Sequence, residues 1–345
     1  MPSPPALLLK ERRGGCDPFD RKQDVFPLLF TATVKSMSNT RRNFLKTMGS
    51  GGFLLLASGP LRFAWGATGS EKGSVRLVFY TDIHARTEWD TPRAMELAAN
   101  AINEQGADLI IAGGDLITDG FQSSTKTVAP RWDAYMAMHK RIRGESYPVI
   151  GNHDLVAAIP EDGTSPSPDP RAIYRERLGL ESTYYAFDAV GYHFVVLDSI
   201  VVTGGELKFN GRVPPEQLEW LKQDLARVQR GTPIVLATHL PLLTSFFTAT
   251  EGLTIPAPKN RVLVNNTEVL DLFRGHNLIL VLQGHLHVSE LLRWQETTFV
   301  TGGAVCAKWW RGPWHGTEEG LCVLDLHGNR VEWNYIDYGW EARRP

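Results

Sequence analysis

Short apolar runs recur along the chain after residue 67, and segments with helical spacing separate most of them. A continuous apolar run bounded by glycine or polar residues is typical of a strand that is buried on both faces. Apolar residues that recur every three or four positions are typical of an amphipathic helix. This pattern predicts strands at 74–80, 108–112, 147–150, 234–237 and 278–282, and helices at 92–102, 131–143, 171–178, 214–228 and 268–273.

Other segments predict antiparallel pairs and loops. Strands 183–188 and 192–197 are expected to form a hairpin, because a short turn with glycine separates them. The C-terminal part predicts four more antiparallel strands, at 289–294, 297–301, 320–326 and 330–336. Residues 204–213 and 241–259 are expected to be loops, and a loop as long as the second usually has a function. Strands that alternate with helices indicate parallel βαβ units, so we predict an α/β fold with two packed sheets flanked by helices.

The first part of the chain has a different pattern. Residues 40–46 contain two adjacent arginines in a twin-arginine pattern, a short apolar stretch follows at 51–60, and small residues at 64 and 66 precede a cleavage point. The apolar stretch is shorter than the roughly 20 residues that span a bilayer, so no stable membrane span is expected. We interpret 37–67 as a signal peptide that is read by the twin-arginine translocase, which predicts a periplasmic or secreted protein. Residues 1–36 would then lie upstream of the true start at Met37, and 68–345 would form a single domain.

Composition and charge narrow the range of partners. The chain has 345 residues, of which 43% are hydrophobic and 21% are charged, and this is ordinary for a globular protein with a sizeable core. Residues 1–67 hold ten Lys/Arg and four Asp/Glu, which leaves 26 basic and 34 acidic residues in the remainder. An acidic domain is a poor partner for a nucleic-acid polymer. Cys306 and Cys322 are compatible with a disulfide or with two buried thiols.

Potential metal ligands follow five of the predicted strands directly. Because ligands gather beyond the carboxyl ends of strands in α/β sheets, we expect these side chains to share one site. Seven ligands are too many for one ion and fit two ions that share a carboxylate. Carboxylate, imidazole and carboxamide without thiolate suit Mn, Fe or Zn, and two such ions favour an anionic substrate and a metal-bound hydroxide. The ligands are Asp82, His84, Asp115, Asn152, His239, His285 and His287.

The order of these fragments is Asp-x-His, Gly-Asp, Gly-Asn-His-Asp, His and Gly-His-x-His, and it resembles the calcineurin-like metallophosphoesterase superfamily. The resemblance covers nearly all of 75–337 and implies a four-layer α/β/β/α sandwich of two mixed sheets flanked by helices. It implies a hydrolase of small phosphate esters, phosphodiesters ahead of monoesters, in which a hydroxide bridging two metals attacks phosphorus. The alternative is a non-catalytic scaffold, but scaffold members tend to lose ligands and every ligand position is filled here.

The resemblance also implies a role for each residue. One metal would be held by Asp82, His84, Asp115 and His287, and the other by Asp115, Asn152, His239 and His285, with Asp115 bridging the two. His153 would contact the phosphate and protonate the leaving oxygen, and Asp154 would orient His153.

Two further features concern the branch and the substrate. Residues 82–84 and 114–120 resemble the cyclic-nucleotide phosphodiesterase branch. Purple acid phosphatases usually carry a tyrosine ligand where Thr118 stands, and the 5′-nucleotidase branch has Gly-Asn-His-Glu and a large C-terminal domain, so neither is favoured. The tryptophan-rich segment 308–316 is either core or a substrate wall, since aromatic faces stack on planar groups. Its candidate substrate-binding residues are Trp309, Trp310, Arg311 and His315.

Overall fold

Strand β1 (Val75–Tyr80) separates two hydrophobic cores, because its successive side chains point to opposite faces. In the computed structural model, which describes residues 74–342, Leu77 and Phe79 pack into a core between two sheets. Val78 and Tyr80 point the other way, into a core on the side of the helices. A strand that is buried on both faces has no polar alternation, which explains the continuous apolar run in the sequence.

The first sheet has five strands in the order β13-β12-β1-β2-β3. Strands β1, β2 (Leu109–Ala112) and β3 (Ser146–Pro148) are parallel. Strand β12 (Gly320–His327) pairs antiparallel with β1, and β13 (Arg330–Asp337) pairs antiparallel with β12. The early βαβ units and the C-terminal hairpin therefore form one mixed sheet.

The second sheet has six strands in the order β10-β11-β9-β8-β5-β4. Strands β5 (Tyr192–Leu197), β8 (Pro233–Thr238) and β9 (Asn277–Gln283) are parallel at its centre. The hairpin partner β4 (Tyr185–Ala189) lies at one edge, as predicted. At the other edge β11 (Thr297–Gly302) runs parallel to β9 and pairs with β10 (Ser289–Trp294). The four C-terminal strands are thus divided between the two sheets.

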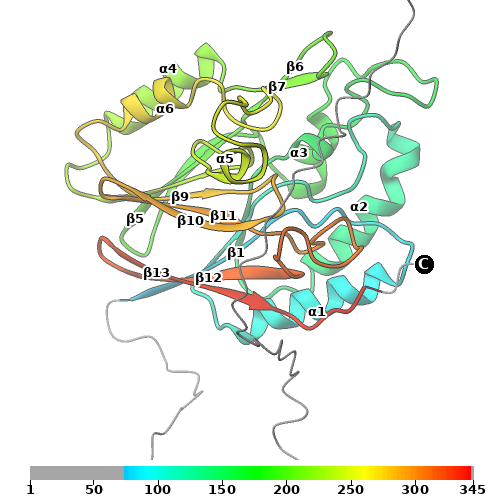
Figure 1. Cartoon of the computed structure of the whole chain (residues 1–345), viewed down its shortest axis with the longest axis horizontal. Coiled ribbons are helices and arrows are strands. Elements are labelled where there is room, and N and C mark those ends of the chain that lie inside the picture. The colour runs from blue at the N-terminus through cyan, green and yellow to red at the C-terminus, as the bar shows by residue number, and fades with distance from the viewer. Residues whose placement is uncertain (1–73, 343–345) are drawn as a thin grey trace, which may run out of the picture. The chain divides into compact units, whose positions relative to one another are not determined.

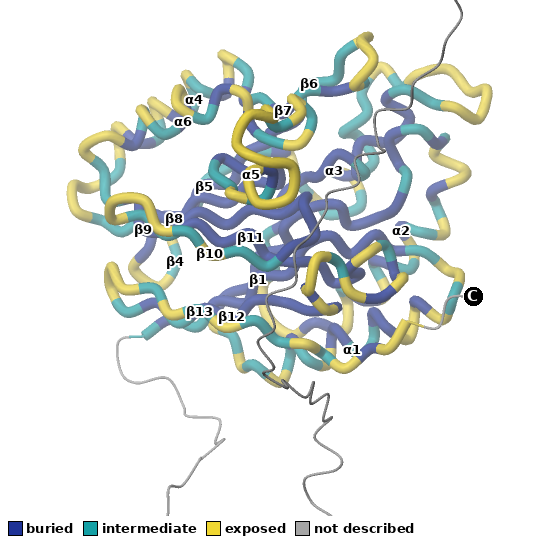
Figure 2. Tube along the Cα trace, in the orientation of Figure 1, coloured by how far each residue is buried: buried dark blue, intermediate teal, exposed yellow. Residues whose placement is uncertain are grey.

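The helices cover the outer faces of the sheet pair. Figure 1 shows α1 (Thr91–Glu104) along the five-stranded sheet, and α4 (Pro215–Leu225) with α6 (Asn266–Leu272) along the six-stranded sheet. The buried residues are concentrated in the strands between these layers (Figure 2). This arrangement confirms the predicted fold class, an α/β fold of two mixed sheets flanked by helices.

Three segments differ from the sequence-based expectation. Helix α2 (Thr125–His139) begins six residues earlier than predicted, because Ser124 caps it by accepting a hydrogen bond from the Thr127 N–H. The predicted loop 204–213 contains β7 (Phe209–Gly211), which pairs with β6 (Ile200–Val202). The predicted loop 241–259 contains the short helix α5 (Phe246–Glu251). Helix α3 (Ala172–Leu178) and the 3₁₀ turn η2 (Asn152–Asp154) complete the elements of the described chain.

The described residues include no helix that is long and apolar enough to cross a membrane. The signal peptide predicted at 37–67 and the upstream segment 1–36 lie outside the described residues. Trp65–Pro345 forms one compact unit, and residues 74–342 belong to it.

A buried ion pair near the start of α3 leads to a stability prediction. Asp198 is buried, and it accepts hydrogen bonds from Arg171 Nε at 2.5 Å and from Thr183 Oγ1 at 2.7 Å. We expect Arg171→Leu to lower the free energy of unfolding by about 3 kcal/mol, because it leaves the buried carboxylate without its cation. Denaturant unfolding monitored by circular dichroism measures this change.

Arg177→Leu is the matched control, since its partner Asp133 is 68% exposed. We expect that variant to lose less than about 1 kcal/mol. Equal destabilisation by the two substitutions would contradict a special role for the Arg171–Asp198 pair.

Candidate metal centre

The loops that follow β1 and β2 are bound to each other, and this brings the first three candidate ligands together. The Asp82 N–H donates to Gly114 O at 2.9 Å, and the His84 N–H donates to Asp115 O at 2.9 Å. The loop after β9 joins them, because the His285 N–H donates to the Asp82 carboxylate at 3.0 Å. Backbone hydrogen bonds therefore position the ligand loops.

The backbone is strained where the ligands sit. Five of the seven predicted ligands have positive φ, between 45° and 70°, although none is glycine: Asp82, His84, Asp115, His285 and His287. A non-glycine residue in this region costs about 1–3 kcal/mol, and such residues cluster at functional sites because the surrounding structure holds them there. The strain turns successive side chains out of the strand direction and into one site.

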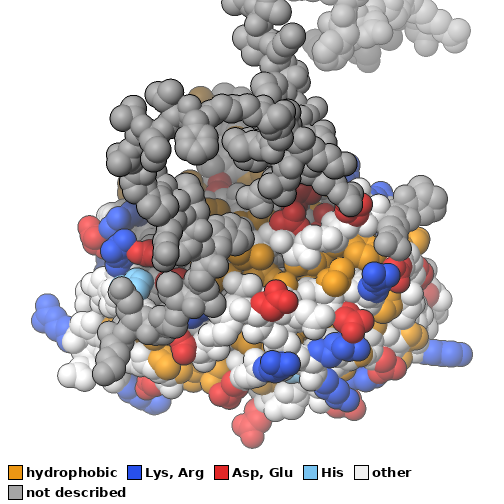
Figure 3. Space-filling model, turned by 90° about the horizontal axis from the view of Figure 1, so that it is seen from below, with side chains coloured by type: hydrophobic (Ala, Val, Ile, Leu, Met, Phe, Trp, Pro, Cys, Tyr) orange, Lys and Arg blue, Asp and Glu red, His pale blue; other side chains and the backbone are white. Residues whose placement is uncertain are grey.

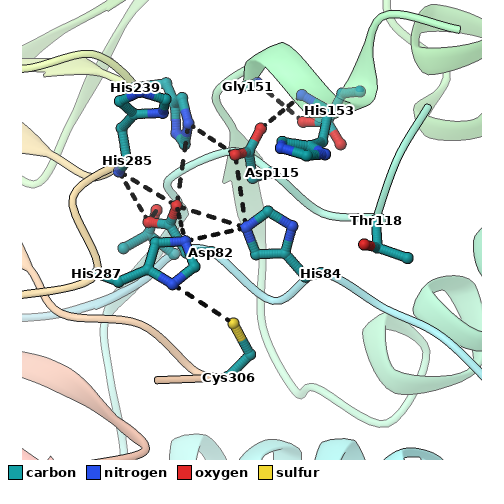
Figure 4. Close-up of polar contacts among 12 residues, drawn as sticks. Asp82, His84, Asp115, Thr118, Gly151, His153, His239, His285, His287 and Cys306 are labelled. Carbon is teal, nitrogen blue, oxygen red and sulfur yellow. Dashed lines mark hydrogen bonds and ion pairs between the residues drawn. The ribbon is translucent and has the colours of Figure 1, made fainter. Parts of the chain in front are cut away.

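Figure 4 shows six of the seven predicted ligands, all except Asn152, around one centre. On one side, His287 Nε2 lies 3.2 Å from Asp82 Oδ1 and 3.1 Å from His84 Nε2. His84 Nε2 lies 3.6 Å from Asp115 Oδ2. These four residues are the set that the resemblance implies for one metal, and all four are buried.

The second set gathers on the other side of Asp115. His239 Nε2 lies 3.1 Å from Asp115 Oδ2, and the His239 and His285 rings are 5.1 Å apart. Asp115, His239 and His285 offer three ligand atoms within 4.8 Å of one another. Asn152 lines the same cavity from η2, with its Oδ1 buried. Asp115 thus belongs to both sets, as a bridging carboxylate must.

Backbone carbonyls determine which nitrogen of three histidines faces the centre. His239 Nδ1 donates to Gly113 O at 2.9 Å, and His287 Nδ1 donates to Ala307 O at 2.6 Å. His285 Nε2 donates to Asn260 O at 3.1 Å. A carbonyl only accepts, so in its neutral form each ring carries its proton on the outer nitrogen and presents a lone pair inward. This outer contact is the usual orientation device of metal-binding histidines.

Unpaired buried atoms show that the donor set fits metal ions. His285 Nδ1 and Asn152 Oδ1 are buried without a hydrogen-bond partner among the described residues, and His239 Nε2 is buried against the Asp115 carboxylate. Burial of an unpaired polar atom is costly, and a bound cation satisfies all three. Burial lowers the pKa of His84 and of His285, so both imidazoles are neutral at neutral pH, as ligands must be.

Two ligand histidines have the opposite shift. Burial acts to lower the pKa of His287, but Cys306 and the Asp82 carboxylate raise it well above its usual value. Burial acts to lower the pKa of His239, but the adjacent Asp115 carboxylate raises it to about 9. Burial in turn acts to raise the pKa of Asp115, and His239 and His153 hold it well below its usual range. The adjacent His239 therefore favours the ionised form of Asp115.

Two glycines leave the space that the carboxylates occupy. A Cβ at Gly151 would lie 2.2 Å from Asp115 Oδ1, and a Cβ at Gly284 would lie 2.7 Å from Asp82 Oδ2. No side chain fits at either position without displacing a ligand. The glycines of Gly-Asn-His-Asp and Gly-His-x-His are therefore required sterically.

His153 lies beside the centre, and the backbone orients it. Its Nδ1 accepts a hydrogen bond from the Asp119 N–H at 3.0 Å, and its own N–H donates to Asp115 Oδ1 at 2.7 Å. Gly120 permits this approach, because a Cβ there would lie 2.1 Å from His153 O. In the neutral ring the proton is then on Nε2.

The expected role of Asp154 is corrected. Its carboxylate accepts from the backbone N–H groups of Leu116, Ile117 and Gly151, not from the His153 ring. Burial and the charge of Asp115 raise the pKa of Asp154 to about 8. Asp154 thus ties the Asp115 loop to η2 and acts on His153 only through the backbone.

A cavity of about 950 Å³ opens over the centre. Two of the four candidate substrate-binding residues, Trp309 and His315, line it. Trp310 does not, because it is buried and donates its Nε1–H to His84 O at 3.1 Å. Arg311 is exposed and outside the lining. Trp310 therefore supports a ligand loop.

Several contributors to the site carry no signal in the sequence. The backbone carbonyl groups of Gly113, Asn260 and Ala307 orient ligands. Every residue type has such a carbonyl, so the sequence does not indicate which ones do this. Cys306 lies with its Sγ 3.8 Å from His287 Nδ1, although it is 19 residues away in sequence. Cys306 and Cys322 are free, buried thiols, which decides between the two alternatives left by the sequence.

Comparison with known proteins agrees with this geometry. A family model described as calcineurin-like phosphoesterase matches residues 75–289. Purple acid phosphatase 22 of Arabidopsis thaliana is 28% identical over 163 residues, which are 45% of this chain and 33% of that protein. Purple acid phosphatase 15 of the same plant is 28% identical over 170 residues, 48% of this chain and 29% of that protein. The chain thus spans about a third of the length of these relatives.

Two solved structures share the fold. A purple acid phosphatase from yellow lupin seeds superposes with a TM-score of 0.53 at 15% identity, over 79% of this chain and 52% of that one. A dimetal phosphatase from Danio rerio gives 0.51 at 16% identity, over 77% of this chain and 99% of that one. At these identities the likeness concerns the arrangement of the two sheets and their helices.

Proposed function

We propose, from the premise that this chain belongs to the calcineurin-like phosphoesterase family, that it is a dinuclear-metal hydrolase of phosphate esters. One observation carries the proposal: seven buried ligands from five strand ends surround Asp115, with unpaired donor atoms that face inward. We assign Asp82, His84, Asp115 and His287 to one metal. We assign Asp115, Asn152, His239 and His285 to the other, and take Mn, Fe or Zn as the ions.

The metals, when bound, supply positive charge for the phosphate and make water a strong nucleophile at neutral pH. The remaining chemistry belongs to the chain. His153 holds a proton on Nε2, because Asp119 N–H occupies its other nitrogen. In hydrolysis the oxygen of water joins phosphorus and water gives up one proton. The bond to the leaving oxygen breaks, His153 gives that oxygen its proton, and a proton from water restores His153.

We propose that the substrates are phosphodiesters, as the resemblance to the cyclic-nucleotide phosphodiesterase branch implies. Phosphomonoesters are the alternative. The motifs at 82–84 and 114–120 support this choice. Thr118 supports it as well, because its hydroxyl accepts a hydrogen bond from Arg86 and offers no phenolate to the metals. Both proposed metal sets therefore consist of carboxylate, imidazole and carboxamide donors.

We further propose export by the twin-arginine translocase, with a signal at 37–67 and a single mature domain at 68–345 in the periplasm or outside the cell. The support is the arginine pair at 41–42, the short apolar stretch and the small residues before the cleavage point. Mass spectrometry of the protein recovered from the cell envelope tests these boundaries. A mature N-terminus well before residue 60 would contradict them.

We propose a small-molecule phosphate ester as the partner, not a nucleic-acid polymer. The acidic balance of the chain after residue 67 supports this. On the part of the lower face that Figure 3 leaves visible, acidic and basic side chains are interspersed. A polyanion is instead bound by a continuous basic surface.

Metal removal and replacement tests the proposal. We would strip the purified protein of metal, add back Mn, Fe or Zn, and compare hydrolysis of bis-p-nitrophenyl phosphate with that of p-nitrophenyl phosphate. We expect turnover only after metal is restored, with about two metals per chain and a preference for the diester.

The outcomes separate the alternatives. A preference for the monoester would assign a phosphatase. Full loading with two metals and no turnover of either ester would contradict the hydrolase proposal for these esters and favour a scaffold.

A further inference from the structure

Trp309 covers the histidines of the metal centre. Its ring centroid lies 4.0 Å from that of His84, 5.2 Å from that of His287 and 5.0 Å from that of His153. It packs at a tilt on His84, stacks on His287 and lies edge-on to the proposed general acid. The same side chain is only partly buried and lines the cavity of about 950 Å³. Trp309 therefore presents aromatic surface both to the centre and to the space where a substrate lies.

The backbone is strained to hold the ring there. Ala307, Trp309 and Trp310 all have positive φ, at 40°, 55° and 66°. Hydrogen bonds on both sides fix this segment to the centre, from His287 Nδ1 to Ala307 O at 2.6 Å and from Trp310 Nε1 to His84 O at 3.1 Å. Strain that the surroundings maintain at such a place indicates a functional position.

The neighbour His153 decides which part of a substrate meets Trp309. The proton donor must lie beside the leaving oxygen, so the leaving group extends from His153 into the cavity. After the proposed ligand His84, at 4.7 Å, Trp309 is the next aromatic ring to His153 among the ring contacts of the described residues, at 5.0 Å. A planar group attached to the leaving oxygen would stack on it.

We infer that Trp309 determines specificity for the leaving group, and that this site takes phosphate esters whose leaving alcohol carries a planar aromatic group. This inference rests on the proposed hydrolase function. The outer lining suits the same group, because Phe246, His315 and Trp314 pack edge to face at 5.0 Å and 4.4 Å and offer further ring surface. Lys308 lies 4.9 Å over the Trp314 ring and closes that end with a cation.

An aliphatic leaving group is the competing occupant. Leu207 lines the cavity, and Leu253 is 88% exposed just after α5, so apolar side chains lie near the cavity lining. These residues are in surface segments that do not contact His153. Aromatic stacking acts next to the reacting oxygen, whereas aliphatic burial would act farther out.

Two esters that differ only in ring planarity test the inference. Benzyl and cyclohexylmethyl esters have similar size and leaving alcohols of similar acidity, so kcat/KM differs mainly through stacking. We would measure both as phosphomonoesters and as methyl phosphodiesters with the metal-loaded protein. We expect benzyl to be preferred by about tenfold, and Trp309→Leu to reduce the preference to about twofold or less.

Two control variants are compared with Trp309→Leu. Trp309→Phe should retain most of the preference, because it keeps a ring. Trp294→Leu, at a surface tryptophan that is 63% exposed on β10, should leave it unchanged. An unaltered ratio in Trp309→Leu, a parallel fall for both esters, or a wild-type preference for cyclohexylmethyl would overturn the inference.

A binding measurement separates this inference from the proposed function. Benzylphosphonate and cyclohexylmethylphosphonate cannot be hydrolysed at their P–C bonds, and calorimetry measures their Kd without turnover. We expect a similar ratio of Kd values and the same loss in Trp309→Leu. If esters are not hydrolysed but this ratio is observed, the hydrolase proposal fails and the assignment of Trp309 stands; equal Kd values in the wild type would overturn the assignment.

Discussion

Asp115→Asn is expected to abolish phosphate-ester hydrolysis and to leave at most one metal per chain. Asp115 Oδ2 lies 3.1 Å from His239 Nε2 and 3.6 Å from His84 Nε2, one from each proposed ligand set. Its side chain is 2% exposed, so no water replaces the lost charge. Removal of an outer-shell partner of a metal ligand costs about 10–100-fold in metal affinity or activity. Loss of a shared ligand must exceed that, so we expect kcat/KM to fall at least about a thousandfold. Metal analysis and kcat/KM measure the two effects.

Asp119→Asn is the matched control for that variant. Its carboxylate is 34% exposed and lies near Arg86 and Arg131 and 4.0 Å from His153 Nδ1, and asparagine retains the backbone N–H that donates to His153. We expect a change of no more than about tenfold, the lower limit for outer-shell partners. Two bound metals and nearly full activity in Asp115→Asn would refute the bridging assignment.

The layout of the site was predictable because it follows from periodicity. Apolar runs identify the central strands, and parallel strands end at one edge of a sheet. Asp82, Asp115 and His239 each follow such a run, so their convergence required only the topology. The division of the last four strands between two sheets was not predictable in this way, because the sequences of β10 and β12 contain no feature that indicates which strands they pair with.

The errors in the predicted elements have local physical causes. The helix predicted at 131–143 starts too late, because Ser124 provides a cap earlier and Pro130 is accommodated inside α2. The hairpin of β6 and β7 was missed because each strand has only three residues, which is too short for a periodic pattern. Short elements are set by tertiary contacts and not by propensity.

The errors in the site concern backbone geometry. Asp154 follows His153 directly and was expected to orient it, yet the 3₁₀ turn of η2 directs the carboxylate to the N–H groups of Leu116 and Ile117. Trp309 and Trp310 are adjacent, yet Trp309 lines the cavity and Trp310 is buried. Both have positive φ, a backbone conformation that the sequence pattern did not indicate. Residue types identify candidate chemistry, whereas the φ values that aim each side chain depend on the whole fold.

His153→Ala is expected to keep both metals and to slow hydrolysis according to the leaving group. His153 lies beside the ligands, with its ring centroid 4.7 Å from that of His84, and it presents Nε2–H to the cavity. For an alkyl ester, whose leaving oxygen needs a proton, we expect a loss of about 10²–10⁴-fold in kcat. For a p-nitrophenyl ester the loss should be much smaller, because that leaving group departs as the anion. The slope of log kcat against leaving-group pKa measures this difference.

Metal content distinguishes this role from a structural one. His153, His84 and Asp115 offer atoms that lie within 4.8 Å of one another, so the geometry also permits His153 to be a metal ligand. A general acid leaves two metals bound and steepens the slope when removed; a ligand loses metal and slows every ester equally. His139→Ala, at a histidine that stacks on Tyr135 within α2, should change neither quantity. Equal losses for alkyl and p-nitrophenyl esters, with metal retained, would show that the leaving oxygen receives its proton from another group.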